Sequence, residues 1–195
     1  TTTFTRYAKD ATCNTTFTVS SGSYVVTVRP NFTSGTISST GETICYNGNP
    51  TLISSSTAAS GGDAALTYKW QAGGVDIANT NSATYDPPTG LTSTTTYTRF
   101  AKDATCNTTF TQSSGSYVVT VRSNFTTGTI SSTGETICYA GTPTIIGSTT
   151  ASSGGDGTIT YSWRSSADGY TAAISGATSA TYTPPSSLTT TTSYQ

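Results

Sequence analysis

The feature that most constrains this 195-residue chain is an internal repeat. Residues 1–29 and residues 94–122 differ at only three of their 29 positions, and a shift of 93 residues superposes them. The same shift aligns residues 30–70 with residues 123–163, after which the second copy gains four residues. A period of 93 residues is too long for a solenoid unit and matches one independent β-sandwich domain.

The repeat divides the chain into three expected parts. Residues 1–29 would be the C-terminal part of one repeat, 30–122 a complete repeat, and 123–195 the N-terminal three quarters of the next. Both ends are expected to cut through strands, so we expect a segment of a longer chain. Short linkers near residues 30–36 and 123–129 favour domains arranged end to end as an extended rod.

Composition excludes several classes of function. The net charge is −1 and only 9% of residues are charged, which excludes the basic surface of a nucleic-acid-binding protein and a polybasic membrane surface. Twelve Tyr and two Trp supply core volume, and the many Thr residues suit pleated strands. These features predict a β protein with a thin core.

Alternation with a period of two residues indicates strands throughout, and no helical period appears. In LTYKWQ, Leu66, Tyr68 and Trp70 share one face, and ITYSWR repeats the pattern at 159–164. Gly-, Asn- and Pro-rich turns separate such stretches. We predict an all-β chain of tandem immunoglobulin-like antiparallel sandwiches with about seven strands each. The expected core aromatic residues are Tyr68, Trp70, Tyr97, Tyr161 and Trp163.

The sequence contains no recognisable catalytic or metal-binding pattern. Without histidine, a Ser-His-Asp or Cys-His arrangement is impossible. Most carboxylates occupy turn contexts, where Asp caps the backbone. Asp63 and Asp156 lie in Gly-rich loops that could bind calcium weakly, but no D-x-D cluster accompanies them. We therefore predict no enzyme activity, no catalytic residue, no metal site and no cofactor.

The landmarks of the repeat resemble a known family. GETICYNGNPTLISSS, LTYKWQ, ISGATSATYTPPSSLTTTTSY, a late Cys and SYVVTV follow one another. This order is similar to the immunoglobulin-like and PKD-like tandem repeats of giant Bacteroidetes cell-surface adhesins, of the gliding-motility and type IX-secreted kind. The resemblance covers nearly the whole chain, in both copies. It departs from the common pattern in writing T-R-F or T-R-Y, and it carries over no catalytic residue.

The resemblance implies a non-catalytic structural or adhesive repeat segment of a long, extracellular, cell-surface protein. Such a segment would form a stalk or filament for adhesion or gliding. Its expected partners are neighbouring repeats, a surface glycan or protein ligand, and further copies in filaments; nucleic acid is not expected. The alternative is a carbohydrate-binding accessory module of a secreted enzyme, for which Tyr46, Tyr139 and Tyr170 are candidate platform residues.

The cysteines suggest a structural disulfide, with free buried thiols as the alternative. Cys45 is expected near the start of the second piece of the first strand, and Cys106 near the turn between the last two strands. If that piece runs parallel to the last strand, Cys45 and Cys106 would approach each other within one domain. The bond would add about 4 kcal/mol of stability. A Cys106–Cys138 pair is the disfavoured rival, and Cys13 and Cys138 would pair outside the chain.

Overall fold

The computed structural model describes all 195 residues and is almost entirely β, which confirms the expected all-β class. Its one helical element is a single 3-10 turn, Ser166–Asp168, and no helix has the length and apolar character needed to cross a membrane. The chain divides into two compact units. The first contains residues 1–40, 52–85 and 96–117, and the second contains 41–51, 86–95 and 118–195.

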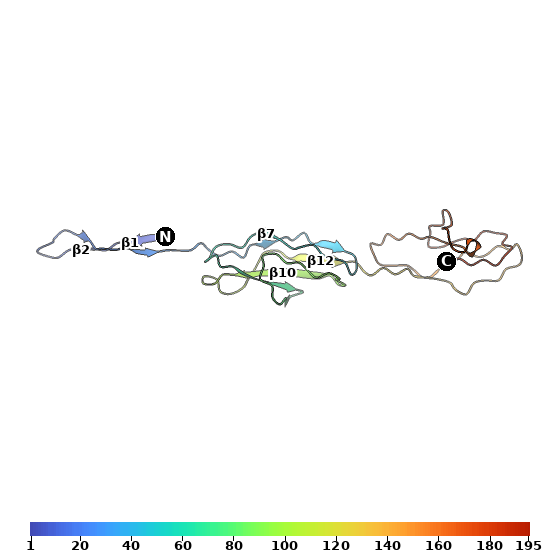
Figure 1. The fold of residues 1–195 in the computed structure, drawn as a ribbon, viewed down its shortest axis with the longest axis horizontal. Coiled ribbons are helices and arrows are strands. Elements are labelled where there is room, and N and C mark those ends of the chain that lie inside the picture. The colour runs from blue at the N-terminus through green and yellow to red at the C-terminus, as the bar shows by residue number, and fades with distance from the viewer. The chain divides into compact units, whose positions relative to one another are not determined.

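Fourteen short strands make up the sheets, and most pair antiparallel (Figure 1). They are β1 Thr2–Phe4, β2 Tyr7–Ala8, β3 Thr18–Val19, β4 Tyr24–Val26, β5 Thr36–Ile37, β6 Glu42–Ile44, β7 Ser55–Thr57, β8 Thr67–Ala72, β9 Val75–Asp76, β10 Thr95–Lys102, β11 Thr111–Gln112, β12 Tyr117–Val121, β13 Thr129–Ile130 and β14 Ser148–Thr150. The largest sheet has the order β6-β12-β10-β8-β9, with β11 paired to β10.

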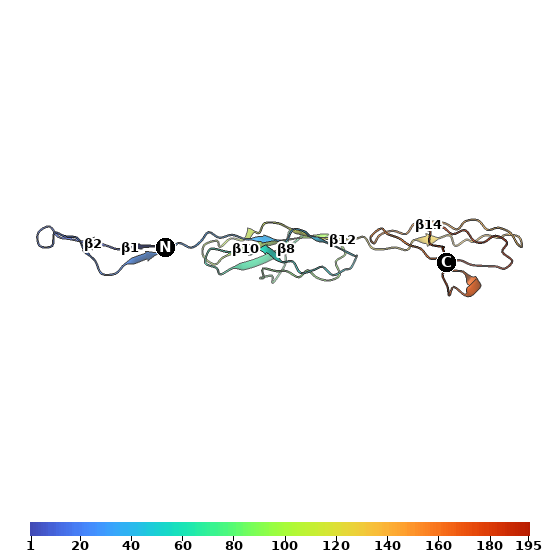
Figure 2. The same cartoon turned by 90° about the horizontal axis from the view of Figure 1, so that it is seen from above.

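The longest ladder joins β8 and β10, which lie side by side in Figure 2. Their antiparallel register runs from Tyr97 opposite Ala72 to Lys102 opposite Thr67. The burial of β10 alternates with a period of two residues, as expected of a half-buried sheet, whereas β8 is half-buried at every residue except Trp70. Trp70 is completely buried, and Lys69 lies on the other face of β8, where its Nζ atom is 5.0 Å from the centre of the Phe100 ring.

A column of aromatic rings forms the core beside this ladder. Trp70 stacks on Tyr85 with ring centres 5.6 Å apart, and Tyr85 contacts Tyr97 at the same distance. Trp70 is 0% and Tyr97 1% exposed, and the indole N–H of Trp70 donates to the carbonyl of Ser82 at 2.9 Å. Burial, with a contribution from Tyr85, raises the pKa of Tyr97. Two of the column's three rings, Trp70 and Tyr97, are among the largest fully buried side chains of the chain.

The second unit contains the one parallel pair of strands. β6 pairs with β12 in the register Glu42 opposite Val119 and Ile44 opposite Val121. The carboxylate of Glu42 accepts hydrogen bonds from both the backbone N–H (2.8 Å) and the hydroxyl (3.2 Å) of Thr51. This acid, the first residue of β6, therefore holds a loop in place.

Residues 123–195 repeat the aromatic column but not the long ladder. Trp163 stacks on Tyr182 at 5.4 Å, and Tyr182 contacts Tyr194 at 5.2 Å. The prediction of a strand at residues 159–164 is wrong, because the structure has no strand there. In the first copy the corresponding strand, β8, pairs with β10. Residues 192–195 correspond to the first four residues of β10. They provide one short contact, in which Arg164 and Gln195 exchange two backbone hydrogen bonds of 2.8 and 3.1 Å. A strand without a ladder partner is not maintained.

Candidate functional site at the junctions between repeats

A Gly-rich loop holds the linker that leads into each repeat. In the loop Ser60–Asp63, the N–H of Gly62 donates to the carbonyl of Pro30 at 2.9 Å, and Ser60 exchanges two backbone bonds with Thr33. The neighbouring Gly61 has φ +83°, and a Cβ there would lie 2.7 Å from the carbonyl carbon of Asn31. Glycine is required because the loop backbone lies directly against the linker backbone.

The same contacts occur at the second junction. Gly155 donates to the carbonyl of Ser123 at 2.9 Å, and Ser153 exchanges backbone bonds of 2.8 and 3.0 Å with Thr126. A Cβ at Gly154 would lie 2.7 Å from the carbonyl carbon of Asn124. Both linkers are therefore held by the same clasp, which we define as the S-G-G-D loop together with the four linker residues that it contacts.

The first clasp includes one carboxylate, that of Asp63, and contacts a second, that of Asp103. Asp63 accepts hydrogen bonds from the N–H of Ala65 (2.9 Å) and the hydroxyl of Thr105 (2.8 Å). Its side chain is 6% exposed, and its Oδ2 atom lies 4.0 Å from the guanidinium of Arg29. Arg29 is the last residue of the expected first part of the chain, whereas Asp63 belongs to the next repeat. This ion pair therefore crosses the expected repeat boundary.

Asp103 is the most buried acid of this cluster, at 1% exposure. Its Oδ1 atom accepts three backbone hydrogen bonds, from Thr105 (2.9 Å), Cys106 (2.6 Å) and Asn107 (2.9 Å). Burial raises the pKa of Asp103, but these N–H groups and the charge of Arg29 lower it more, so that it lies below the ordinary value. Asp103 is therefore ionised at neutral pH.

The second oxygen of Asp103 has no hydrogen-bond partner and faces the clasp. A Cβ at Gly62 would lie 2.7 Å from the Cγ atom of Asp103, so the loop and the carboxylate are in close contact. No group of three or more His, Cys, Asp or Glu side chains could hold a metal ion. Within this cluster the positive charge is that of Arg29, and the arrangement is suited to fixing a linker.

Of the two cysteines expected to pair, Cys106 lies in the turn after β10 as expected, whereas Cys45 lies elsewhere. All four cysteines are free and exposed. Cys45 directly follows Ile44, the last residue of β6, so it lies at the end of that strand and not near its start; the N–H of Arg122, just after β12, bonds to the carbonyl of Ile44 at 3.0 Å. The Cys45–Cys106 pairing stays a prediction. Peptide mapping without reduction tests it, and a free thiol at either residue would contradict it.

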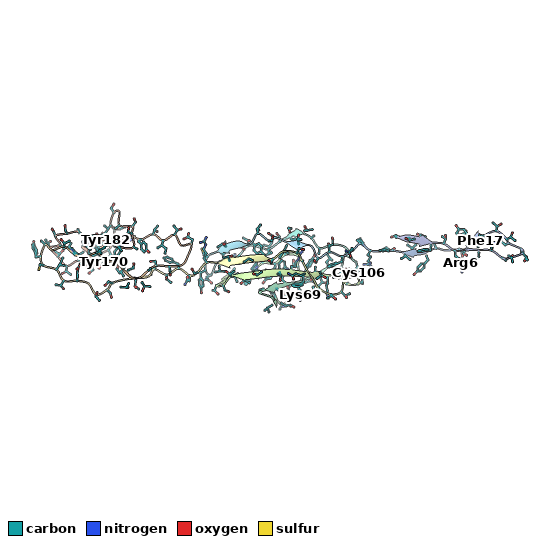
Figure 3. The ribbon with its side chains drawn as sticks, turned by 180° about the vertical axis from the view of Figure 1, so that it is seen from behind. Arg6, Phe17, Lys69, Cys106, Tyr170 and Tyr182 are labelled. Atoms are coloured by element: carbon teal, nitrogen blue, oxygen red, sulfur yellow. The ribbon has the colours of Figure 1, made fainter.

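Cys13 and Cys106 occupy matching turns. Each donates its backbone N–H, at 2.6 Å, to the Asp three residues earlier, which is Asp10 or Asp103. Figure 3 shows Cys106 on this turn. The expected outside partners of Cys13 and Cys138 also stay predictions.

The aromatic candidates fall into two groups. Trp70, Tyr97 and Trp163 are buried, and Tyr68 and Tyr161 are half-buried. Of the platform candidates for carbohydrate, Tyr46 is 42% and Tyr139 82% exposed, whereas Tyr170 is half-buried and its carbonyl accepts a bond from Arg164. Tyr46 and Tyr139 occupy the same position in successive repeats. Each repeat therefore contributes only one of these two exposed rings, and they do not form a platform within one repeat.

Sequence reasoning missed one buried charge. Arg99 is 0% exposed within β10 and contacts the Tyr68 ring at 5.3 Å. The signal was present, since the alternation that buries Tyr97 and Ala101 also directs Arg99 inward. The general rule that Arg stays at the surface hid it.

Comparison with known proteins identifies a family. No curated protein matches this chain. A family model matches it twice in succession, at residues 33–123 and 126–195. The chain therefore belongs to the family described as Domain of unknown function (DUF8696).

Proposed function

We propose that this chain is a non-catalytic structural and adhesive repeat segment of a long bacterial surface protein. Each repeat would be an immunoglobulin-like β-sandwich, and the repeats would form a stalk or filament outside the cell. The single observation that carries the proposal is the clasp, which holds both linkers through the same backbone contacts. A stalk keeps its domains at fixed positions and transmits mechanical force along them only if the linkers between the domains do not act as free hinges.

The charge cluster adds a second support. Arg29 and Asp63 lie on opposite sides of the expected boundary, and Asp103 is held ionised behind them. A partly buried ion pair contributes more than an exposed one, because solvent screens it less. The rings of the aromatic column pack in the core, and Glu42 is hydrogen-bonded to the loop residue Thr51, so both have structural roles.

Backbone dynamics test the proposal. The N–H order parameters of residues 31–33 and 124–126, from 15N relaxation, should be about 0.85, the value of rigid backbone. Gly61→Val should lower them at the first junction only, which leaves the second as an internal control. Values below about 0.6 at both wild-type junctions would indicate flexible linkers and would overturn the structural role.

The carbohydrate-binding alternative rests on the exposure of Tyr46 and Tyr139. A glycan array probed with the wild-type chain and with Tyr139→Ala separates it from the structural role. Glycan binding that Tyr139→Ala abolishes would favour the alternative. Binding that is unchanged by this substitution would place any ligand site elsewhere.

A further inference from the structure

The sheet formed by β8, β10 and β11 uses one of its faces for the core. On that face Trp70 stacks on Tyr85, and Arg99 is completely buried. Side chains alternate along a strand, so Lys69 and Phe100, which lie directly opposite each other in the register of β8 and β10, point to the other face. Lys69 is labelled in Figure 3. This outer face of the sheet therefore carries charged and aromatic side chains that the core does not use.

Two lysines of the outer face share one phenyl ring. The register that places Phe100 opposite Gln112 brings Phe110, two residues earlier, beside Lys102. The Nζ atom of Lys102 lies 4.9 Å from the centre of the Phe110 ring, and that of Lys69 lies 5.3 Å from the same centre. The ring attracts each ammonium group, but the two ammonium groups repel each other because both carry a positive charge.

A single carboxylate compensates these two charges. Lys69 donates from Nζ to both carboxylate oxygens of Asp76, at 3.1 and 3.0 Å, and Gln71 also donates to Asp76, at 2.7 Å. Lys102 has no ion pair and no side-chain hydrogen bond. The outer face therefore keeps one uncompensated positive charge beside a compensated one, which makes it complementary to an anion.

The side chains around these charges indicate which anion fits. Phe100 and Phe110 are half-buried, and Gln112 is exposed. Partly exposed rings offer an apolar surface, and the amide offers hydrogen bonds. A sugar acid matches this combination, because it joins a carboxylate to a rigid ring that has an apolar C–H face and several hydroxyl groups. An acidic peptide carries its carboxylates on flexible side chains and has no such rigid apolar face.

The lysine–phenylalanine pair recurs along the chain, but the second lysine does not. Lys9 and Phe17 repeat the pair, with 4.9 Å between the Nζ atom and the centre of the ring. The counterpart of Lys69 in the following repeat is Ser162. The arrangement of two lysines around one ring is therefore a feature of residues 30–122 and not of every repeat.

We propose that the face formed by Lys69, Phe100, Lys102 and Phe110 binds saccharides that carry carboxylate groups. The sugar carboxylate lies between the two ammonium groups, and the apolar face of the sugar ring packs against the phenyl rings. The inference rests on the adhesive part of the proposed function and gives it a site and a class of ligand. The site is separate from Tyr46 and the matching tyrosine of the next repeat, on which the carbohydrate-module alternative rests.

NMR titration of the full 195-residue chain, labelled with 15N, gives the test. The three probes are an oligogalacturonate, its neutral methyl ester of the same length, and an oligoglutamate of the same charge. The oligogalacturonate should shift the backbone N–H signals of β8, β10 and β11, and its binding should weaken as the salt concentration rises from about 20 to about 200 mM. The methyl ester and the oligoglutamate should bind much more weakly.

Single substitutions locate the site. Lys102→Gln should weaken binding of the oligogalacturonate by about fivefold, the upper end of what an exposed ion pair contributes, and Phe110→Leu should also weaken it. Arg122→Gln removes the same charge from an exposed residue outside the face, so it should leave the Kd unchanged. Asp76→Asn removes the carboxylate that competes for Lys69 and should tighten binding. The dispersion of the same spectra shows that each variant is folded.

Four outcomes would overturn the proposal. They are no binding of the oligogalacturonate, equally tight binding of its methyl ester, equally tight binding of the oligoglutamate, and equal effects of Lys102→Gln and Arg122→Gln. Tight binding of the oligoglutamate would instead make the face a site for acidic peptides. None of these outcomes changes the order parameters of the junctions, so failure of this site is separable from failure of the structural role.

Discussion

Arg99 donates a hydrogen bond of 3.0 Å from its Nε atom to the Oγ atom of Ser113, and both side chains are buried. The four acceptors around its guanidinium are neutral: two carbonyls and two hydroxyls. Burial lowers the pKa of Arg99, with the neighbouring Tyr68 acting in the opposite direction. A buried charge is costly to desolvate, and here four hydrogen bonds offset that cost. Without Arg99 the carbonyls of Ser34 and Ala83 would each keep one donor, the hydroxyls of Ser113 and Ser55.

Arg99→Met should therefore lower the free energy of unfolding of residues 30–122 by about 3 kcal/mol, because it removes all four hydrogen bonds of one buried, charged donor. Urea unfolding followed by the fluorescence of Trp70, in a Trp163→Phe background, measures it. Arg6→Met is the matched control: the same substitution at an exposed position should change stability by less than about 0.5 kcal/mol. Equal effects of the two substitutions would show that the buried network contributes nothing specific.

Asp103 should make stability depend on acid pH. Its folded-state pKa lies below the ordinary value. Its contribution is therefore present above the unfolded pKa of about 4 and is lost as the pH falls through the lower folded-state pKa. Asp103→Asn keeps the shape of the side chain but removes this titration. The urea midpoint of the variant should lie below that of the wild type at pH 7, and the difference should shrink below about pH 4.

The result can be checked against the other acids with lowered pKa. Asp10 and Asp76 also lie below their ordinary value, Asp10 through the N–H groups of Asn14, Thr12 and Cys13, and Asp76 through Gln71 and Lys69. Both remain in the variant, so only the difference between variant and wild type reports on Asp103. A difference that stays constant from pH 7 to pH 2 would mean that the ionisation of Asp103 is not linked to folding.

Local pattern predicted those parts of the fold that depend on one strand at a time. The alternation in residues 66–71 correctly gave β8 and its inward Trp70, and no helical period meant no long helix. The same alternation at residues 159–164 wrongly predicted a strand. A strand also needs a neighbouring strand to pair with, and the local sequence pattern does not reveal whether there is one. Strand existence is thus partly a non-local property.

The parts of the candidate site that the sequence did not reveal are also non-local. Asp63 and Asp103 were recognised only as turn residues, and they meet because the loop of one and the turn of the other pack together. Arg29 joins them from outside the expected repeat. Cys45 was placed at the wrong end of its strand because the bounds of β6, Glu42–Ile44, could not be read to within three residues.

The last prediction concerns the close contact of Gly35 with a neighbouring segment. Gly35 has φ +69°, and a Cβ there would lie 2.7 Å from both the carbonyl carbon of Ala58 and the backbone nitrogen of Ala59. Gly35→Ala should therefore combine two costs, about 1 kcal/mol for a left-handed backbone and about 1–3 kcal/mol for the displaced backbone. Gly74→Ala, with φ +84° and open space around it, should show only the first cost. Urea unfolding of the two variants gives the difference directly, and a Gly35→Ala variant as stable as Gly74→Ala would mean that the two segments do not approach as closely as the structure shows.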